Sequence, residues 1–310
     1  MKGNKTFAVL LAVMLLCGCG RRPSLLPHSG GKPFEVLVVG DLDGVLTGQL
    51  TLPVAGLPQQ EPCFDVSSVT KDRYNDASRL ARNIVCTDID AHRHHALRLR
   101  YAYDVYASPQ LIVTIEGPSL HELSNRKAAI GAQLRRLFTQ AETSRCIADL
   151  ETRHASAMSR KASALFGVSL LLPPEMNASK EAEGFLWISD DGRALQRSIC
   201  LYTLPLGGDL LAGRDSVMAL HLPGEEAGMH VRTATAEPAV ETADHTTVIR
   251  GLWEMTGDVM GGPFVLHARP DTTRGRILVA EAMLYAPGAL KRNEMHRLES
   301  ILHTLRPLQK

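Results

Sequence analysis

Two long apolar runs constrain the fold of this chain most strongly: "QLIVTIEG" (110–117) and "RILVAEAMLY" (276–285). Continuous apolar runs of this length, rich in β-branched residues, are typical of buried strands. A proline-containing turn and an amphipathic helix follow each run. Further strand patterns lie at 34–41, 82–89, 96–107 and 197–204. We therefore predict an α+β body of mostly antiparallel sheet with about three long helices.

The helices are indicated by local signals. "TKDRYNDASRLA" (70–81) is expected to form a short helix, and Ser119 with Glu122 forms a capping box that opens a longer one. A second long helix is expected from about Thr143 to Leu165. The third follows the strand at 276–285, and its buried stripe is Leu298, Ile301, Leu302 and Leu305.

The second half of the chain echoes the first as a strand, turn and helix. An ancient duplication would explain two similar strand-rich halves, and a chance resemblance of ordinary strand–turn–helix units would explain them as well. We place the halves at 34–165 and 166–310. Two lobes and one continuous sheet both remain compatible with the periodicity.

The N-terminus carries an export signal. Lys2 and Lys5 precede the apolar run "TFAVLLAVMLL", which is about half as long as a membrane-spanning helix needs to be. The sequence Leu16-Cys17-Gly18-Cys19 resembles a lipobox, with an aliphatic residue three places before the modified cysteine and a small residue directly before it. The resemblance implies that residues 1–18 are a cleaved signal peptide and that Cys19 carries a thioether-linked diacylglycerol and an amide-linked acyl chain. An ordinary secreted protein is the alternative.

Residues 19–33 are expected to tether the body to its membrane. Residues 20–33 contain three prolines and three glycines, and fourteen such residues span on the order of 20 Å as a coil. No aspartate follows Cys19. By resemblance to lipoprotein sorting rules, this favours the outer membrane, with the protein facing the periplasm.

Charge and cysteine spacing exclude several classes of function. Without residues 1–18, which contain two lysines and no acid, 32 basic residues face 33 acidic ones, so nothing predicts binding to nucleic acid. Cys63, Cys86, Cys146 and Cys200 match no zinc or redox spacing. In an oxidising compartment they could form disulfides, but we expect buried free thiols. We expect no cofactor.

Several stretches together resemble one family. They are "GLPQQEPCFDV" (56–66), "RNIV" (82–85), "YASPQLIV" (106–113), "FLWIS" (185–189), "RGLWEMTGDVMGGPFV" (250–265) and "YAPGALKRNEMHRLESILHTL" (285–305). They are similar to the domain of unknown function 4837 (DUF4837) family, lipoproteins of Gram-negative gut and oral anaerobes, over essentially the whole chain after the signal. The resemblance implies an envelope location and a shared fold, and no activity.

Common catalytic motifs are absent, since no G-x-S-x-G, H-E-x-x-H or Walker pattern occurs. Glu254 and Asp258, four residues apart, are the carboxylates that could perform general acid–base chemistry in a hydrolase acting on envelope glycan or peptide. His92 and His94 would share one face of an extended segment, as in a metal site. A solvated turn is the favoured interpretation of that histidine pair, so no metal is predicted.

The stretch 250–265 is the best surface to test. It is expected to form a hairpin whose glycines serve the turn and whose Trp253 packs in the core. If the stretch is functional, a recognition loop of Arg250, Trp253, Gly257, Gly261 and Gly262 is expected. We therefore predict a non-catalytic binding or accessory lipoprotein, whose partner is an envelope protein, peptide or glycan; the hydrolase is the alternative.

Overall fold

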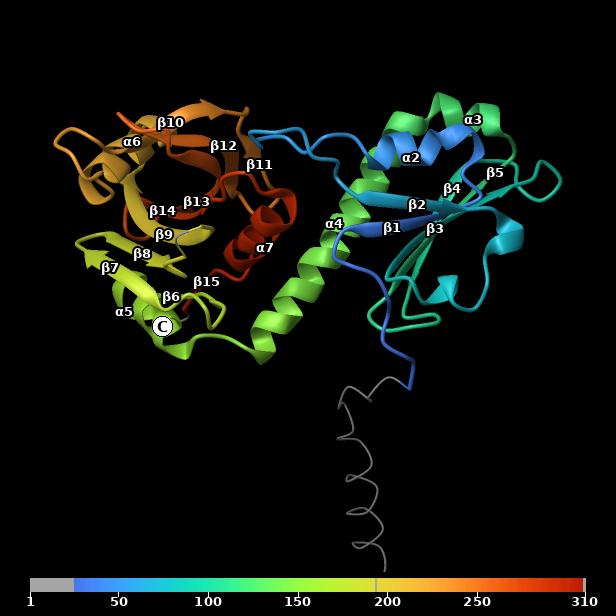
Figure 1. The fold of residues 1–310 in the computed structure, drawn as a ribbon, viewed down its shortest axis with the longest axis horizontal. Helices are drawn as coiled ribbons and strands as arrows, with labels where there is room; N and C mark the ends of the chain where they lie inside the picture. The colour runs from blue at the N-terminus through green and yellow to red at the C-terminus, as the bar shows by residue number, and fades with distance from the viewer. Residues whose placement is uncertain (1–24, 193, 309–310) are drawn as a thin grey trace, which may run out of the picture.

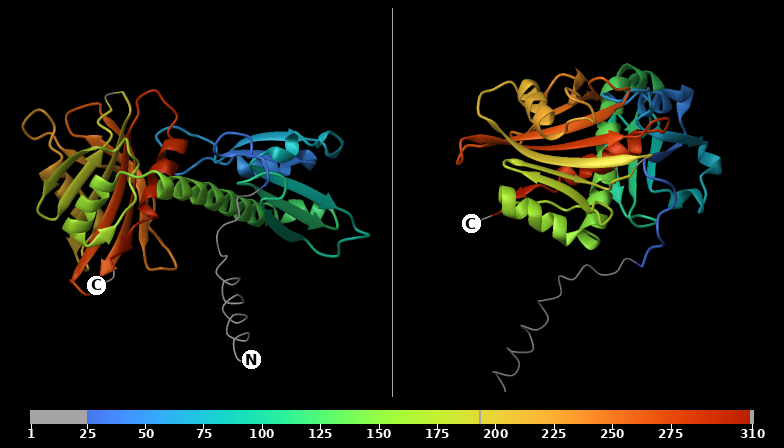
Figure 2. Two further views of the ribbon diagram at one scale, coloured as in Figure 1. Left: turned by 90° about the horizontal axis from the view of Figure 1, so that it is seen from below. Right: turned by 60° about the vertical axis from the view of Figure 1, so that its left-hand side comes forward.

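The computed structural model describes residues 25–192 and 194–308. Figures 1 and 2 show two units, each built around its own sheet, with the long helix α4 (Lys127–Thr152) running between them. In the described part of the chain, no helix is both long and apolar enough to span a membrane.

The N-terminal unit is a mixed sheet with helices packed on it. Its strands are arranged in the order β2-β1-β3-β5-β4, in which β4 alone is antiparallel to its neighbour. The elements of this unit besides α4 are β1 (Glu35–Val39), α2 (Val45–Leu50), β2 (Asp65–Val69), β3 (Asn83–Ile89), β4 (Arg98–Tyr103), β5 (Leu111–Gly117) and α3 (Leu120–Asn125). Phe34, Phe64 and Phe138 pack together in its core.

The C-terminal unit is an antiparallel sheet of order β10-β12-β13-β14-β9-β8-β7. Its strands are β7 (Ala178–Ala182), β8 (Phe185–Ser189), β9 (Gln196–Pro205), β10 (Val231–Ala236), β11 (Val240–Glu241, paired with β12), β12 (Thr247–Met255), β13 (Gly261–Asp271) and β14 (Arg276–Tyr285). Its helices are α5 (Ser156–Phe166), α6 (Leu210–His221) and α7 (Arg292–Leu302), and β6 (Val168–Ser169) pairs with β15 (Arg306–Pro307).

Both faces of this sheet are covered, which explains the continuous apolar run of β14. Leu284 points into the core shared with α5 and α7, whereas Met283 points into the opposite core, where Met218 of α6 packs. Successive side chains of a strand point to opposite faces, so apolar residues pack on both sides of a strand that is covered on both faces.

A buried ion pair holds α6 on the sheet. The Arg214 guanidinium donates from Nε and Nη2 to Oε1 of Glu281 at 2.9 and 2.7 Å, and neither side chain is exposed to solvent. The Tyr202 hydroxyl donates to the other Glu281 oxygen at 2.8 Å, and Arg214 lies over the ring of Phe264. Burial, followed by the charge of Glu281, raises the pKa of Tyr202 well above its ordinary value, so the phenol stays protonated and donates.

A carboxylate of the N-terminal unit caps a helix of the C-terminal unit and so joins the two units. The buried Glu61 carboxylate accepts from the backbone N–H groups of Lys291 (2.7 Å) and Arg292 (2.9 Å) at the start of α7. Arg292 also pairs with Asp65 at 2.6 Å. Figure 1 shows the segment between α2 and β2, which contains Glu61, reaching across to the C-terminal unit.

The predicted α+β class is confirmed, and most strand pairs are antiparallel. The two units differ in topology, because the first sheet is largely parallel. The helix predicted at 70–81 is wrong: only short 3-10 turns form, at Lys71–Arg73 and Ser78–Leu80. Asn75 Oδ1 accepts from the N–H groups of Ala77 and Ser78, a local bond that competes with a helix.

The predicted long helix from Thr143 to Leu165 is also wrong. The chain leaves the helical conformation at Arg153 (φ −139°), and α5 begins at Ser156. The Ala155 N–H donates to the Leu172 carbonyl instead of continuing the helix. Of the predicted capping box, the serine cap is confirmed, since Ser119 Oγ accepts from the Glu122 N–H at 3.2 Å.

Candidate functional site: an aromatic and methionine-lined cavity

A cavity of about 270 Å³ lies on the face of the C-terminal sheet that α6 covers in part. Side chains from six strands form its floor. The lining residues are Lys180, Trp187, Gln196, Ser198, Val231, Trp253, Met255, Met283 and Tyr285 from strands, His221, Leu222 and Pro223 from the end of α6, and Met260.

Strand register brings these distant residues together. Lys180 of β7 lies opposite Trp187 of β8, and Met283 of β14 lies opposite Ser198 of β9. The helix α6 ends at His221, whose ring stacks on Phe185 at 4.3 Å and whose carbonyl accepts from Lys180 Nζ at 2.8 Å. The helix stops at the edge of the cavity, and His221, Leu222 and Pro223 form part of its wall.

The chemistry of the cavity is mostly apolar. Met255, Met260 and Met283 provide flexible, polarisable walls that adapt to differently shaped ligands. Burial, followed by the charge of Lys180, lowers the pKa of His221, so this imidazole is uncharged at pH 7. Lys180 is then the charged group of the lining, and one of its three N–H donors is engaged.

The stretch 250–265 forms the expected hairpin of β12 and β13, with the turn at 256–260. Its glycines serve backbone geometry. Gly257 has a φ of +80°, and a Cβ on Gly262 would lie 2.0 Å from the Leu284 carbonyl oxygen. A Cβ on Gly261 would lie 2.7 Å from the Trp253 oxygen.

The predicted loop residues point in different directions. Trp253 is only 5 % exposed and lines the cavity. Arg250 lies on the opposite face of β12 and pairs with Glu299 of α7. The side chains of β12 in this hairpin therefore face the cavity on one side of the sheet and α7 on the other.

The two predicted catalytic carboxylates lie outside the cavity lining. Glu254 pairs with Arg232 of the neighbouring strand at 2.6 Å, and Asp258 accepts from the backbone N–H of Val259. Both side chains are thus engaged locally, and no lining residue of the cavity is a carboxylate.

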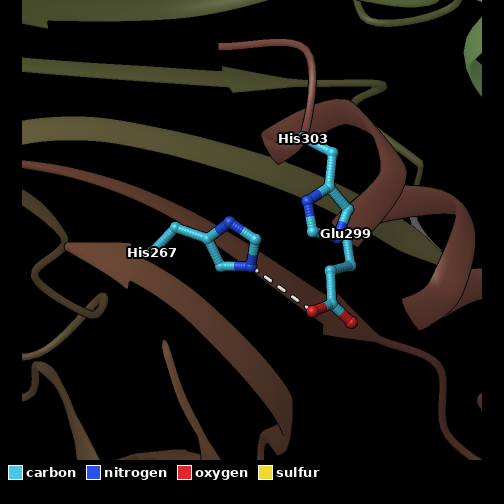
Figure 3. Close-up of side chains that lie close together, drawn as sticks. All are labelled: His267, Glu299 and His303. Atoms are coloured by element: carbon cyan, nitrogen blue, oxygen red, sulfur yellow. Dashed lines mark hydrogen bonds and ion pairs between the residues drawn. The ribbon is translucent and has the colours of Figure 1, made fainter. Parts of the chain in front are cut away.

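The predicted histidine pair lies in the turn between β3 and β4. His94 Nε2 contacts Asp88 at 2.9 Å, and the His92 N–H donates to Asp90. In the described part of the chain, the group with metal-ligand geometry is instead His267, Glu299 and His303 (Figure 3). Glu299 and His303 are four residues apart at the C-terminal end of α7. This E-x-x-x-H spacing was the sequence signal for two of the three residues.

The predicted lipidation site, Cys19, lies outside the described residues. Cys63, Cys86, Cys146 and Cys200 are free thiols. Burial, followed by the charge of Glu281, raises the pKa of Cys200 well above its ordinary value, so that thiol is unreactive at neutral pH.

Comparison with known proteins gives family matches and weak structural likenesses. No curated protein matches the chain in sequence. A point mutant of the protein Mog1 is 9 % identical at a TM-score of 0.30, covering 46 % of this chain and 92 % of that one. The Ran-binding protein Mog1p of Saccharomyces cerevisiae is 9 % identical at a TM-score of 0.29, covering 46 % and 91 %. Neither likeness carries a conclusion about this chain.

Family models match the two units separately. Residues 29–151 match a domain of unknown function, DUF8532, and residues 155–304 match the domain of unknown function DUF4837. The DUF4837 resemblance expected over the whole chain is thus found in the second unit, which contains the cavity and the hairpin. The C-terminal unit is therefore similar to the DUF4837 family over residues 155–304.

Proposed function

We propose that this protein is a cell-envelope lipoprotein that binds a partner without catalysis. Acylated Cys19 anchors it in the outer membrane, facing the periplasm, and the cavity of the C-terminal unit accepts a large apolar side chain of an envelope protein or peptide. The observation that carries the binding proposal is the cavity of about 270 Å³ walled by tryptophan, tyrosine and methionine. Pockets of this kind, mostly apolar with a few polar groups, are typical ligand sites.

The lining favours an apolar side chain over a sugar. Trp253 is almost fully buried, so its ring is not a free platform for stacking on a sugar ring. Three methionines adapt to an aliphatic or aromatic group. Lys180 has N–H donors left for a carboxylate beside that group, so we infer a partner segment with a large apolar residue next to an acidic one.

The anchor is tested by Cys19→Ser, with Cys17→Ser as the matched control. We expect Cys19→Ser to lose the acylated N-terminal peptide in mass spectrometry and to leave the membrane fraction, because a stable anchor needs two or more acyl chains. Cys17→Ser should be acylated and retained. Membrane retention of an unacylated Cys19→Ser protein would contradict the anchor.

The cavity is tested by crosslinking in intact cells followed by mass spectrometry. Ser198→Leu fills the cavity from its floor, and Trp187→Ala removes an aromatic wall. Loss of a central aromatic contact costs about 2 kcal/mol or more, roughly a 30-fold weaker complex. We expect both variants to lose the crosslinked partner.

Glu254→Gln is the matched control, because Glu254 follows Trp253 on β12 and points to the opposite face of the sheet. It should keep the partner. Folding of each variant is checked by circular dichroism. A folded Ser198→Leu protein that retains the wild-type partner would rule out the cavity as the binding site.

A further inference from the structure

Three side chains of metal-ligand type converge between β13 and α7. One ligand atom from each of His267, Glu299 and His303 lies within 4.8 Å of the others. His267 Nε2 is 3.3 Å from Glu299 Oε1, and the two imidazole rings are 4.9 Å apart at 63°. Figure 3 shows both rings and the carboxylate facing a common centre.

The scaffold holds two of these groups firmly and leaves the third accessible. His267 is 6 % exposed on the sheet, and Glu299 is 9 % exposed on α7. His303 follows Glu299 by four residues, which places both side chains on the same side of that helical turn. His303 is exposed, and neither of its ring nitrogens is hydrogen-bonded within the described chain.

A cavity adjoins this cluster. It has a volume of about 270 Å³, and His267 and His303 line it together with Arg269, Arg306 and Asp244. Arg269 is engaged by Asp244 at 2.8 Å, whereas Arg306 donates only to backbone carbonyls. The cavity therefore gives a small ion access to the two imidazoles. Its two arginines, Arg269 and Arg306, are cationic groups that a ligand entering after the ion would meet.

We propose that His267, Glu299 and His303 bind a divalent transition-metal ion, Zn²⁺ in the first instance. Two imidazoles and one carboxylate are a known zinc ligand set that leaves a coordination position for water or a small ligand. A water or an anion entering through the cavity fits this open position. The proposal is independent of the binding function assigned to the tryptophan-containing cavity.

The Glu299 carboxylate is prepared for this role. Arg250 and His267 both contact Oε1, and in the described chain Oε2 accepts no hydrogen bond. Arg250 thus orients the carboxylate while leaving one oxygen for a metal, as partners of ligating carboxylates do.

Isothermal titration of the purified full chain with Zn²⁺, after removal of metal by a chelator, tests the site. We expect one ion per chain. Because even changes outside the ligand shell cost about 10- to 100-fold in metal affinity, His303→Ala and His267→Gln should each weaken binding by more than about 100-fold. X-ray absorption of the zinc-loaded protein should show only nitrogen and oxygen ligands.

His94→Ala is the control, since it removes a histidine of the β3–β4 turn. It should bind Zn²⁺ as the wild type does, as should Ser198→Leu, which alters only the other cavity. His303 is exposed, so His303→Ala should fold normally even if His267→Gln does not. Absence of Zn²⁺ binding by the wild type, or undiminished binding by folded His303→Ala, would overturn the proposal.

Discussion

Arg214→Ala should lower the free energy of unfolding of the C-terminal unit by about 3–5 kcal/mol, because removing one partner of a buried ion pair leaves the other charge uncompensated. Arg214 and Glu281 are both 0 % exposed. With alanine at 214, the Glu281 carboxylate would keep only the Tyr202 hydroxyl as a side-chain donor. Loss of the cation over Phe264 adds to the effect.

Urea unfolding followed by tryptophan fluorescence measures this directly, because both tryptophans, Trp187 and Trp253, lie in the C-terminal unit. The double variant Arg214→Met/Glu281→Leu is the control. Replacing a buried pair by apolar residues of similar volume is often neutral or stabilising, so this variant should recover most of the loss. If Arg214→Ala cost less than about 1 kcal/mol, which is the range of an exposed pair, the pair would not be buried in solution.

Glu61→Ala should be the second most damaging substitution, and it should act on the junction between the units. It leaves two buried N–H groups at the start of α7 without acceptors. Each such group costs about 1–3 kcal/mol, so a loss of roughly 2–6 kcal/mol is expected. α7 has no side-chain cap of its own, so nothing nearby replaces the carboxylate.

The measurement compares two signals during urea unfolding. Tryptophan fluorescence reports the C-terminal unit, and circular dichroism reports both units. We expect the two curves to coincide for the wild type and to separate for Glu61→Ala, because the cap that couples the units is gone. Asp65→Asn, which weakens a half-exposed pair with Arg292, should cost at most about 1 kcal/mol. Coincident, unshifted curves for Glu61→Ala would show that the cap does not couple the units.

What could be read from the sequence was local. The apolar runs at 110–117 and 276–285 became β5 and β14, the Ser119 cap formed, and the hairpin at 250–265 turned at its glycines. These features depend on side-chain periodicity, backbone freedom and bonds between near neighbours. The export signal, which lies outside the described residues and stays a prediction, rests on the same kind of local pattern.

Other features depended on tertiary pairing. The helix expected to reach Leu165 broke because Ala155 bonds to Leu172, and no pattern within 143–165 contains that bond. The cap on α7 comes from Glu61, 230 residues earlier in the chain. Arg250 and Trp253 do not form one recognition surface, because their side chains lie on opposite faces of β12.

The candidate sites show the same division. Trp253 was identified from sequence, but its cavity also needs Lys180, Trp187 and Met283, which strand order and register bring to one sheet face. Sequence spacing pointed to His92 and His94, whereas the geometric cluster joins β13 to α7. By itself the sequence determined which segments form strands, caps and turns; only the tertiary structure decided which distant side chains meet, because that depends on strand register and helix docking, which local periodicity does not encode.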